Sequence, residues 1–468
     1  MRARSLAASC VLALSACALQ DAPKHDDVTK EALPNLSAPV QWSAQGATGG
    51  AVSNNWLATI GEPQLAALID EAVKYNADLQ IAAARVETAA AYMAGANSPL
   101  WPQVNLVARG GGKMSGDSSG LQGVGLFAAW ELDLWGRVRS AAKSTEYQYG
   151  SASLDAEYAR QSIASLVTKS WLLAIEARLT KAQAEEGVRV SEHLTGLASD
   201  RLRVGVGDDF DVTLAQANTE TFRDTVKSAD LAYQNALRAL EALLGRYPSA
   251  SVAVADRLPA WPGAVPTGVP SELLERRPDV VAAERRVAAA FYRTEEAKAA
   301  RLPKITLVAN LTSISSELFV LQPRDNPVVS FGAGLLQPIF LGGYLQSQVD
   351  ARTAEQKAAI AEYGKVGARA FGEVEGALAA GTTAAEREKI LVRAVRENER
   401  ALELTNVRYR VGSSDLRGVQ QQQLALYSAQ VALLRVQTDR LVQRVNLYLA
   451  LGGSYDAHKV SETGNSTN

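Results

Sequence analysis

The chain has 468 residues, of which 47% are hydrophobic and 21% are charged, and its formal net charge at pH 7 is -2. This balance is typical of a folded chain with a large buried core, and it excludes an intrinsically disordered protein. The near-neutral charge comes without a basic stripe, so the composition also argues against a nucleic-acid-binding protein.

Cysteine and histidine are too scarce for a metal centre. Cys10 and Cys17 both lie in the first twenty residues, so the rest of the chain can form neither a disulfide nor a thiolate metal site. The histidines His25, His193 and His458 lie far apart and lack the close spacing of metal-binding pairs. We therefore expect no metal and no cofactor.

Residues 1–16 have the layout of a secretory signal peptide. Arg2 and Arg4 precede an apolar run from Leu6 to Leu14, and small residues follow it. The run is too short to cross a bilayer as a helix. We expect this segment to be removed from the mature protein.

The stretch from Leu14 to Cys17 resembles a bacterial lipobox. In such a motif the cysteine thiol receives a diacylglycerol, and cleavage leaves Cys17 as an N-terminus that carries an N-acyl chain. Residue 18 is Ala rather than Asp, which resembles the pattern of lipoproteins sent onward to the outer membrane. The alternative is that Cys17 is a small residue beside an ordinary cleavage site.

Residues 17–61 are predicted to be a lipidated N-terminal linker, extended over residues 18–55, because Pro23, Pro34 and Pro39 alternate with polar residues. After the signal peptide, no segment reaches the roughly 18 consecutive apolar residues of a transmembrane helix. Any further membrane contact must therefore come from strands.

A helix is predicted to begin near Glu62 and Pro63, since proline suits the first helical turn. Two apolar rows at seven-residue spacing indicate coiled-coil packing. The rows are Leu65, Ala72, Leu79, Val86 and Met93, and Leu68, Tyr75, Ala82 and Ala89. Periodicity alone does not distinguish this arrangement from a soluble helical bundle.

Two β-hairpins are predicted, in residues 101–135 and 302–341. In both, apolar and polar residues alternate along the first strand, and a loop rich in glycine, serine or proline precedes the second. Each strand therefore has one apolar and one polar face.

Long helices follow each hairpin. No proline occurs between Gly136 and Arg203 or between Gly342 and Arg410, so each helix can run for about 65 residues, or roughly 100 Å. A compact domain is much smaller. The last helix again has two heptad rows, Tyr427, Leu434, Leu441 and Tyr448 beside Leu424, Val431, Thr438 and Val445.

The body is one unit repeated. Arg203-Val204-Gly205 returns as Arg410-Val411-Gly412, about 207 residues later, and Trp135-Gly136 is matched with Leu341-Gly342. The predicted organisation is a first repeat, a proline-rich linker, a second repeat and a disordered C-terminal tail, at residues 62–246, 247–270, 271–453 and 454–468.

The predicted fold is mainly α, with a long coiled helical barrel or tunnel and a small membrane β-barrel portion of four strands per chain. Four strands cannot close a barrel in lipid, where an open edge leaves backbone groups unpaired. The chain must therefore oligomerise. The alternative is a soluble cap of two hairpins that never meets lipid.

Five stretches then resemble the outer-membrane efflux proteins of TolC type, in the lipoprotein branch that includes the NodT-like factors. They are residues 130–139, 274–280, 300–303, 409–412 and 445–453. The resemblance covers nearly the whole mature chain. It implies a homotrimer that pools its strands into one twelve-stranded barrel in the outer membrane, continued by a periplasmic helical tunnel.

This resemblance also implies partners and a function. Such a duct exports small molecules or drugs together with an inner-membrane pump and a periplasmic adaptor (a membrane fusion protein), and the pump selects the substrate. The duct would be lipid-anchored in the outer membrane with its body in the periplasm, and it would be no enzyme. Gly116 to Gly120 look faintly like a serine-protease loop, but no histidine and aspartate are arranged to support them.

The same resemblance places the periplasmic tips at the two glycine-containing turns. The expected adaptor contacts are Val204, Gly205, Val206, Val411, Gly412 and Ser413, although plain helix-turn chemistry explains the same residues. Asp211 falls where relatives place an acidic gate residue. In the second tip the acidic positions are Gly418 and Gln421, so Asp415, Arg417, Gln421 or the run Gln420 to Gln423 are the candidate gate contacts.

Two other functions remain open at this point. One is a secretion duct for a polypeptide, and the other is a coiled-coil structural lipoprotein that conducts nothing. The hairpins favour a duct, because a spacer has no need of strands of membrane length.

Overall fold

The computed structural model describes residues 20–36, 39–109, 122–315 and 327–456. The predicted signal peptide, Cys17 and residues 457–468 lie outside these ranges. The chain divides into two compact units, which we describe separately. Unit 1 comprises residues 1–36, 83–155 and 279–366, and unit 2 comprises residues 37–82, 156–278 and 367–468. Among the described residues, no helix is both long and apolar enough to cross a membrane.

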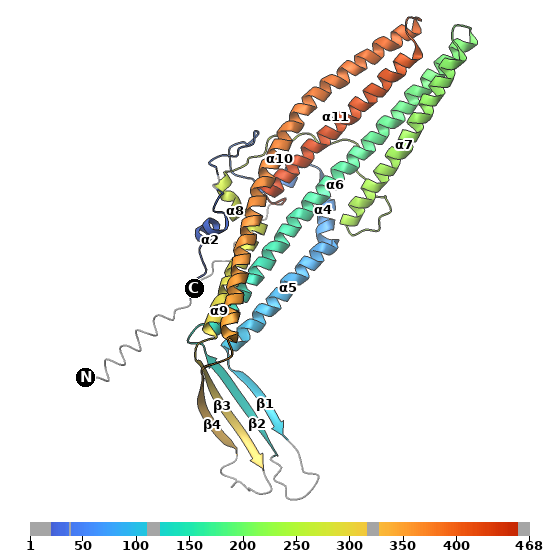
Figure 1. The fold of residues 1–468 in the computed structure, drawn as a ribbon. Coiled ribbons are helices and arrows are strands. Elements are labelled where there is room, and N and C mark those ends of the chain that lie inside the picture. The colour runs from blue at the N-terminus through green and yellow to red at the C-terminus, as the bar shows by residue number, and fades with distance from the viewer. Residues whose placement is uncertain (1–19, 37–38, 110–121, 316–326, 457–468) are drawn as a thin grey trace. The chain divides into compact units, whose positions relative to one another are not determined.

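Unit 1 contains one antiparallel sheet of four strands in the order β1-β2-β3-β4 (Figure 1). The strands are β1 (Gln103–Arg109), β2 (Gln122–Leu132), β3 (Lys304–Ser315) and β4 (Val328–Leu336). The two predicted hairpins are therefore present, and β2 pairs with β3 to join them. Both β1 and β4 are edge strands of this sheet.

The register gives the sheet two chemically different faces. Leu106 pairs with Leu126, Leu126 with Leu311 and Leu311 with Val329, so apolar side chains share one face. The members of this apolar face are Val104, Leu106, Ala108, Val124, Leu126, Ala128, Trp130, Leu132, Ile305, Leu307, Ala309, Leu311, Val329, Phe331, Ala333 and Leu335. The opposite, mixed face carries small and polar residues with a few apolar ones, as at Asn105, Gly125, Thr312 and Ser330.

The long helices form without interruption, as predicted. Helices α6 (Arg137–Arg203) and α10 (Tyr344–Arg410) have 67 residues each, and each contributes residues to both units. In unit 2, α7 (Asp209–Leu243) and α11 (Leu416–Ala450) have 35 residues each and return from short turns (Figure 1). Leu434, Leu441 and Tyr448 of the predicted heptad row are buried.

The structure corrects the alignment of the two halves by one residue. The first residues of α6 and α10 are 207 positions apart, so Gly136 corresponds to Gly343 rather than to Gly342. Gly136 and Gly343 both have positive φ, at 74° and 83°. Sequence identity alone was ambiguous here, because Gly342 and Gly343 are adjacent.

The predicted first helix is interrupted at Asn76, which separates α4 (Pro63–Tyr75) from α5 (Ala77–Asn97). Asn76 is extended and buried, and its Nδ2 donates to the Leu243 carbonyl oxygen at 2.9 Å. Its Oδ1 accepts from the amide of Asp78 and so caps α5. The heptad rows were unbroken in sequence, and a contact with a distant residue decides the break.

In both halves, the glycine of the repeated Leu-Gly pair lies against a break between two helices. Gly245 has φ of 73°, and a Cβ placed there would lie 2.7 Å from the Tyr75 carbonyl oxygen. Gly452 has φ of 70° and would place a Cβ 3.1 Å from the carbonyl oxygen of Arg276, the last residue of α8 (Leu273–Arg276). The helix α9 (Pro278–Ala299) begins two residues later. Each glycine of the repeated pair therefore lies where two backbone segments approach closely.

The N-terminal linker was predicted to be extended over residues 18–55, and this is wrong for α2 (His25–Ala32), which lies inside that stretch. A second short helix, α3 (Trp56–Ile60), follows the stretch within residues 17–61. Val28 and Trp56 are buried, and burial of these side chains favours ordered turns over an extended chain. In unit 1, His25 Nδ1 lies 2.9 Å from Glu284 Oε2. Residues 247–269, all of them described, contain no helix or extended strand, and their isolated bridge joins Pro266 to Thr48.

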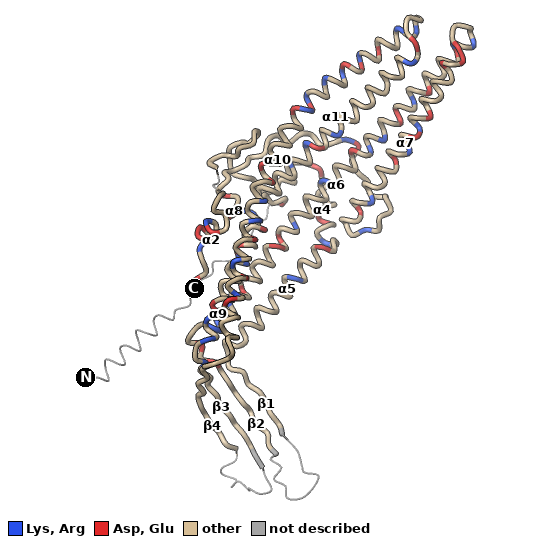
Figure 2. The backbone as a smooth tube through the Cα atoms, viewed as in Figure 1, with Lys and Arg blue, Asp and Glu red and all other residues tan. Residues whose placement is uncertain are grey.

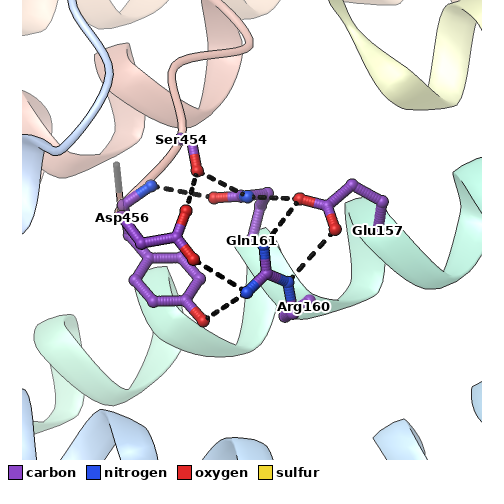
Figure 3. A network of polar contacts seen from close by, with 6 residues as sticks. Glu157, Arg160, Gln161, Ser454 and Asp456 are labelled. Atoms are coloured by element: carbon purple, nitrogen blue, oxygen red, sulfur yellow. Dashed lines mark hydrogen bonds and ion pairs between the residues drawn. The ribbon is translucent and has the colours of Figure 1, made fainter. Parts of the chain in front are cut away.

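The C-terminal tail was expected to begin at residue 454, but Ser454, Tyr455 and Asp456 are fixed to α6 within unit 2 (Figure 3). Arg160 Nη1 donates to Asp456 Oδ2 at 2.8 Å and to Tyr455 Oη at 2.9 Å. Gln161 Nε2 donates to Ser454 Oγ at 3.0 Å. The prediction was wrong for these three residues because it rested on the polar composition of the tail, which does not reveal contacts with α6.

Candidate functional site

The tip turns of unit 2 are built alike. Gly205 and Gly412 have φ of 77° and 78°, and each follows the last turn of a long helix. Asp208 Oδ1 accepts from the Asp211 amide, and Asp415 Oδ1 accepts from the Gly418 amide, both at 2.9 Å. Asp415, predicted as a gate candidate, is therefore the N-cap of α11, and Asp208 is the N-cap of α7.

All six predicted tip residues lie on these turns and are exposed. Val204 is 68% exposed, Val206 is 64% exposed and Val411 is 72% exposed, with Gly205, Gly412 and Ser413 beside them. Exposed valines on a polar helix end carry a cost in water that a protein partner can relieve. The arrangement offers two small apolar surfaces of the same construction.

Contacts between the two tips hold α6 and α10 together. Arg201 Nη1 donates to the Tyr409 carbonyl oxygen at 3.2 Å, and its guanidinium lies 4.9 Å from the centre of the Tyr409 ring. Below them, an apolar cluster fills the space between the four helices. Its buried members are Leu194, Ala198, Ala215, Tyr409, Leu416 and Val419.

Asp211 lies half-buried beside this contact. Burial raises the pKa of its carboxyl group, the negative charges of Asp208 and Asp415 raise it further, and the positive charge of Arg201 lowers it. The two tips thus bring three carboxylates into one electrostatic group. The surroundings of Asp211 disfavour its ionised form.

The remaining gate candidates have different environments. Arg417 lies with its guanidinium 5.7 Å from the centre of the Phe210 ring, so it contacts the opposite tip. Gln421 is exposed. Two other amides of the run turn inward, since Gln420 and Gln423 are buried.

The buried amides bind backbone and side-chain groups of the neighbouring hairpin of helices. Gln420 Nε2 donates to the Leu214 carbonyl oxygen at 3.2 Å. Gln423 Nε2 donates to the Gly187 carbonyl oxygen at 3.0 Å and to Ser191 Oγ at 2.9 Å. Their sequence signal is the four-residue spacing, since Gln420 follows Leu416 and Gln423 follows Val419 by one helical turn on the buried face.

The sheet of unit 1 is the second candidate site. Its apolar face is exposed in the single chain, with Leu106 68% exposed, Phe331 83% exposed and Leu335 70% exposed. Lys, Arg, Asp and Glu follow the helices and are sparse in the strands (Figure 2). An exposed apolar face of this extent fits contact with lipid.

Polar contacts close the junction where β2 and β3 leave the sheet. Glu131 Oε2 lies 2.9 Å from Lys304 Nζ, and its two carboxylate oxygens accept from Arg137 at 2.9 and 2.7 Å. Trp135 Nε1 donates to the Pro303 carbonyl oxygen at 2.7 Å. Asp133 accepts from the amides that begin α6. Sequence reasoning had singled out residues 130–139 without assigning these contacts.

A family model described as "Outer membrane efflux protein" matches residues 68–246 and 269–453. The chain belongs to the outer membrane efflux protein family. The two matched segments each contain one hairpin, one long helix and one tip turn, so the duplicated architecture of this chain is that of the family.

Family members with curated names are similar over nearly their whole length. The pyoverdine export outer membrane protein OpmQ of Pseudomonas aeruginosa is 30% identical over 478 residues, which cover 98% of this chain and 98% of that protein. The outer membrane protein OprJ of the same species is 30% identical and covers 95% and 94%. Both are outer-membrane proteins by name.

Solved structures of the family have the same fold. The open state of the MtrE outer membrane channel of Neisseria gonorrhoeae superposes with a TM-score of 0.80, at 26% identity, and covers 94% of this chain and 100% of that one. The outer-membrane channel OprN gives a TM-score of 0.80 at 26% identity. The chain therefore has the fold of these outer-membrane channels, as the sequence predicted.

Proposed function

We propose that the chain is one subunit of a trimeric outer-membrane duct through which small molecules leave the cell. The observation that carries the proposal is the four-stranded sheet with one apolar face and two open edges. In lipid, each open edge leaves a row of unpaired amides and carbonyls, so the sheet is complete only when further copies pair with β1 and β4. Three copies would supply twelve strands.

The face assignment follows from the same sheet. The apolar face would contact lipid, and the mixed face, with Gln103, Asn105 and Asn310, would line the water-filled lumen. The duct itself would perform no catalysis and would hold no cofactor. Its lipid anchor, a diacylglycerol and an N-acyl chain on Cys17, would add to the attachment provided by the strands.

The tips would serve as the docking and closing end of the duct. Val204, Val206 and Val411 would pack against hairpins of a periplasmic adaptor, which in turn contacts an inner-membrane pump. Asp211, repeated three times around the axis of the trimer, would hold a ring of charge at the constriction, with Arg201 and Arg417 fixing the neighbouring helices.

Relatives are named for export of pyoverdine, antibiotics or toluene, so small organic molecules are the substrate class. The test is deletion of the gene and growth on a panel of dyes, detergents and antibiotics, with the wild type or Cys17→Ala restored separately. Increased susceptibility that the wild type rescues, and Cys17→Ala rescues less, is the expected result.

Purified protein in a planar bilayer provides the second measurement. A duct gives discrete conductance steps, whereas a structural lipoprotein gives none. If the bilayer stays silent and the deletion strain keeps its resistance, the structural role replaces the duct. Loss of one exported polypeptide from the medium, with resistance unchanged, would instead identify a secretion duct.

A further inference from the structure

The halves of unit 1 match closely enough to predict a contact that a single chain does not contain. Trp130 Nε1 donates to the Leu100 carbonyl oxygen at 3.1 Å, and Gln337 Nε2 donates to the Arg301 carbonyl oxygen at 3.2 Å. Gln337 follows Trp130 by 207 positions, and Arg301 follows Leu100 by 201. The offset of 207 relates each residue of β2 that pairs with β1 to one of β4, and the offset of 201 relates each residue of β1 to one of β3. With these offsets the register of β1 with β2 becomes the register of β3 with β4.

Inside the chain, the end of the first hairpin meets the start of the second. There Leu132 pairs with Ile305, Glu131 forms an ion pair with Lys304, and Trp135 donates to the carbonyl oxygen of Pro303. In a closed ring of copies, the end of the second hairpin must meet the start of the first hairpin of the next copy. The intrachain junction is therefore a template for the junction between copies.

The residues at the second junction have the opposite chemistry. By the offset of 207, Pro338 replaces the carboxylate of Glu131, Phe340 replaces Asp133 and Gly342 replaces the indole of Trp135. Ile339 and Phe340 are 89% and 85% exposed in the single chain, and Leu341 is 53% exposed. Three consecutive apolar side chains are thus uncovered in the single chain, where the first half has a hydrogen-bonded polar network.

A matching apolar surface precedes β1. Trp101 is 73% exposed and lies directly before Pro102, the residue that corresponds to Pro303. Antiparallel pairing of β4 with β1 brings the end of one strand beside the beginning of the other. The register of β2 and β3, carried over by the two offsets, sets Ile339 opposite Val104 and Leu341 opposite Pro102.

We propose that residues 338–341 form an apolar seam with residues 101–104 of the neighbouring copy. The partner is a second copy of this chain, and the proposal rests on the trimeric duct proposed above. Beyond the strand pairing, the seam would add burial of apolar side chains between copies, whereas the junction of the two halves of one chain adds an ion pair and an indole hydrogen bond to the β2–β3 pairing. Removing the apolar groups should therefore weaken the trimer and leave the intrachain junction intact.

Cysteine cross-linking in the full lipoprotein tests the register. Cys17 is the only cysteine after the predicted signal peptide, and its thiol is expected to carry lipid. The variant with both Ile339→Cys and Val104→Cys places two thiols at directly opposed positions, about 5 Å apart at Cβ. The matched control combines Ile339→Cys with Ala108→Cys, which lies four residues further along the same face. Oxidation should link the first pair into covalent trimers several-fold more completely than the control pair.

The second variant separates assembly from folding. Phe340→Asp places a carboxylate where Asp133 caps α6, so it removes an apolar seam residue while offering α10 an N-cap. We expect Phe340→Asp to dissociate to monomers at a lower temperature in detergent than the wild type. Phe340→Leu and the exposed linker variant Tyr247→Asp should keep the wild-type dissociation temperature.

The outcomes distinguish this seam from the duct itself. Suppose that the wild type is a trimer but the Ile339→Cys and Val104→Cys thiols stay unlinked, or Phe340→Asp leaves the dissociation temperature unchanged. Either result would overturn the seam and leave the duct in place. Labelling of the Ile339→Cys thiol by a lipid-soluble maleimide in place of cross-linking would assign the segment to the membrane instead. A wild-type chain that remains monomeric in native mass spectrometry would overturn the trimeric duct.

Discussion

Gly245 and Gly452 are equivalent positions of the two halves with the same backbone constraint. Both have positive φ, and each lies against the carbonyl group that ends a helix, of Tyr75 in one case and of Arg276 in the other. A side chain at either position would adopt a disfavoured backbone conformation. Its Cβ would clash with the Tyr75 carbonyl oxygen at Gly245 and make a tight contact with the Arg276 carbonyl oxygen at Gly452. The repeated Leu-Gly pair was visible in sequence, but its clash partners were not.

Gly245→Ala should therefore destabilise the protein by about 1–3 kcal/mol. Thermal unfolding followed by circular dichroism in detergent measures the effect as a lower midpoint. The matched control is Gly95→Ala, because a Cβ at this position in α5 meets open space and alanine favours a helix. Equal midpoints for Gly245→Ala and the wild type would contradict the prediction, because they would show that the backbone around residue 245 adjusts to the added methyl group without a loss of stability.

Glu241 contributes stability that depends on pH. Its buried carboxylate accepts from the amides of Ala250, Ser251 and Val252, at 2.7, 2.6 and 2.9 Å. These hydrogen bonds hold the pKa of Glu241 below its usual range despite the opposing effect of burial. A lowered pKa in the folded state means that the stabilisation is present above the pKa of the unfolded chain and is lost as the pH falls.

We expect Glu241→Gln to lower the unfolding midpoint at pH 7, because an amide cannot accept all of these hydrogen bonds. The difference from the wild type should shrink as the pH falls below about 4.3, where Glu241 of the unfolded chain begins to take up a proton while the folded chain still holds it ionised. Unfolding curves between pH 3 and pH 8 measure it. A difference that stays constant over this range would contradict the assignment.

At the scale of elements, the tip turns show what repetition did and did not conserve. Both turns have the same glycine and the same aspartate N-cap, Asp208 in one and Asp415 in the other. The residue that follows the cap by three positions differs, as Asp211 in the first tip and Gly418 in the second. The tips are therefore alike in backbone and unlike in charge.

Asp211→Asn should stabilise the closed tips at pH 7. The raised pKa of Asp211 means that its ionised form is disfavoured in the folded tip, and this cost is relieved as the pH falls through that pKa. Single-channel recording should show fewer openings for Asp211→Asn at pH 7, and a weaker dependence on pH than in the wild type. Unchanged opening of the variant would remove Asp211 from the gate. Asp209→Asn, on the same helical turn, is the matched control.

The heptad rows of the first and last helices illustrate how far local pattern reaches. The rows predicted helices where α4, α5 and α11 occur, because side chains on one helical face recur at this spacing. They failed to reveal the break at Asn76, whose amide binds a carbonyl group about 170 residues away. A pattern within one helix carries no information about such a partner.

At the scale of the whole molecule, segments far apart in sequence are held on the helices by small polar networks. Ser454, Tyr455 and Asp456 are fixed to Arg160 and Gln161 of α6 (Figure 3). The pKa of Arg160 is raised, because its hydrogen bonds and charge interactions with Glu157 and Asp456 outweigh the effect of burial. The C-terminal segment therefore contributes to the stability of unit 2.

A chain that ends at Gly453 should lose this network and unfold at a lower temperature than one that ends at Asp456. The pair differs by three residues, so the comparison isolates their contribution. Arg160→Gln in the full-length chain should reproduce a large part of the loss, as measured by thermal unfolding. If the two truncated chains have the same midpoint, the network is not a source of stability.

The amino-acid sequence by itself determined the two hairpins, the long helices, their duplication and the fold family, because periodicity, proline placement and turn glycines act within a few residues of each other. The tertiary structure alone decided which residues meet. It turned Gln420 and Gln423 inward, broke the first predicted helix at Asn76 and fixed Asp456 to Arg160. Each of these depends on atoms brought together from distant parts of the chain, and a local sequence pattern carries no information about such distant partners.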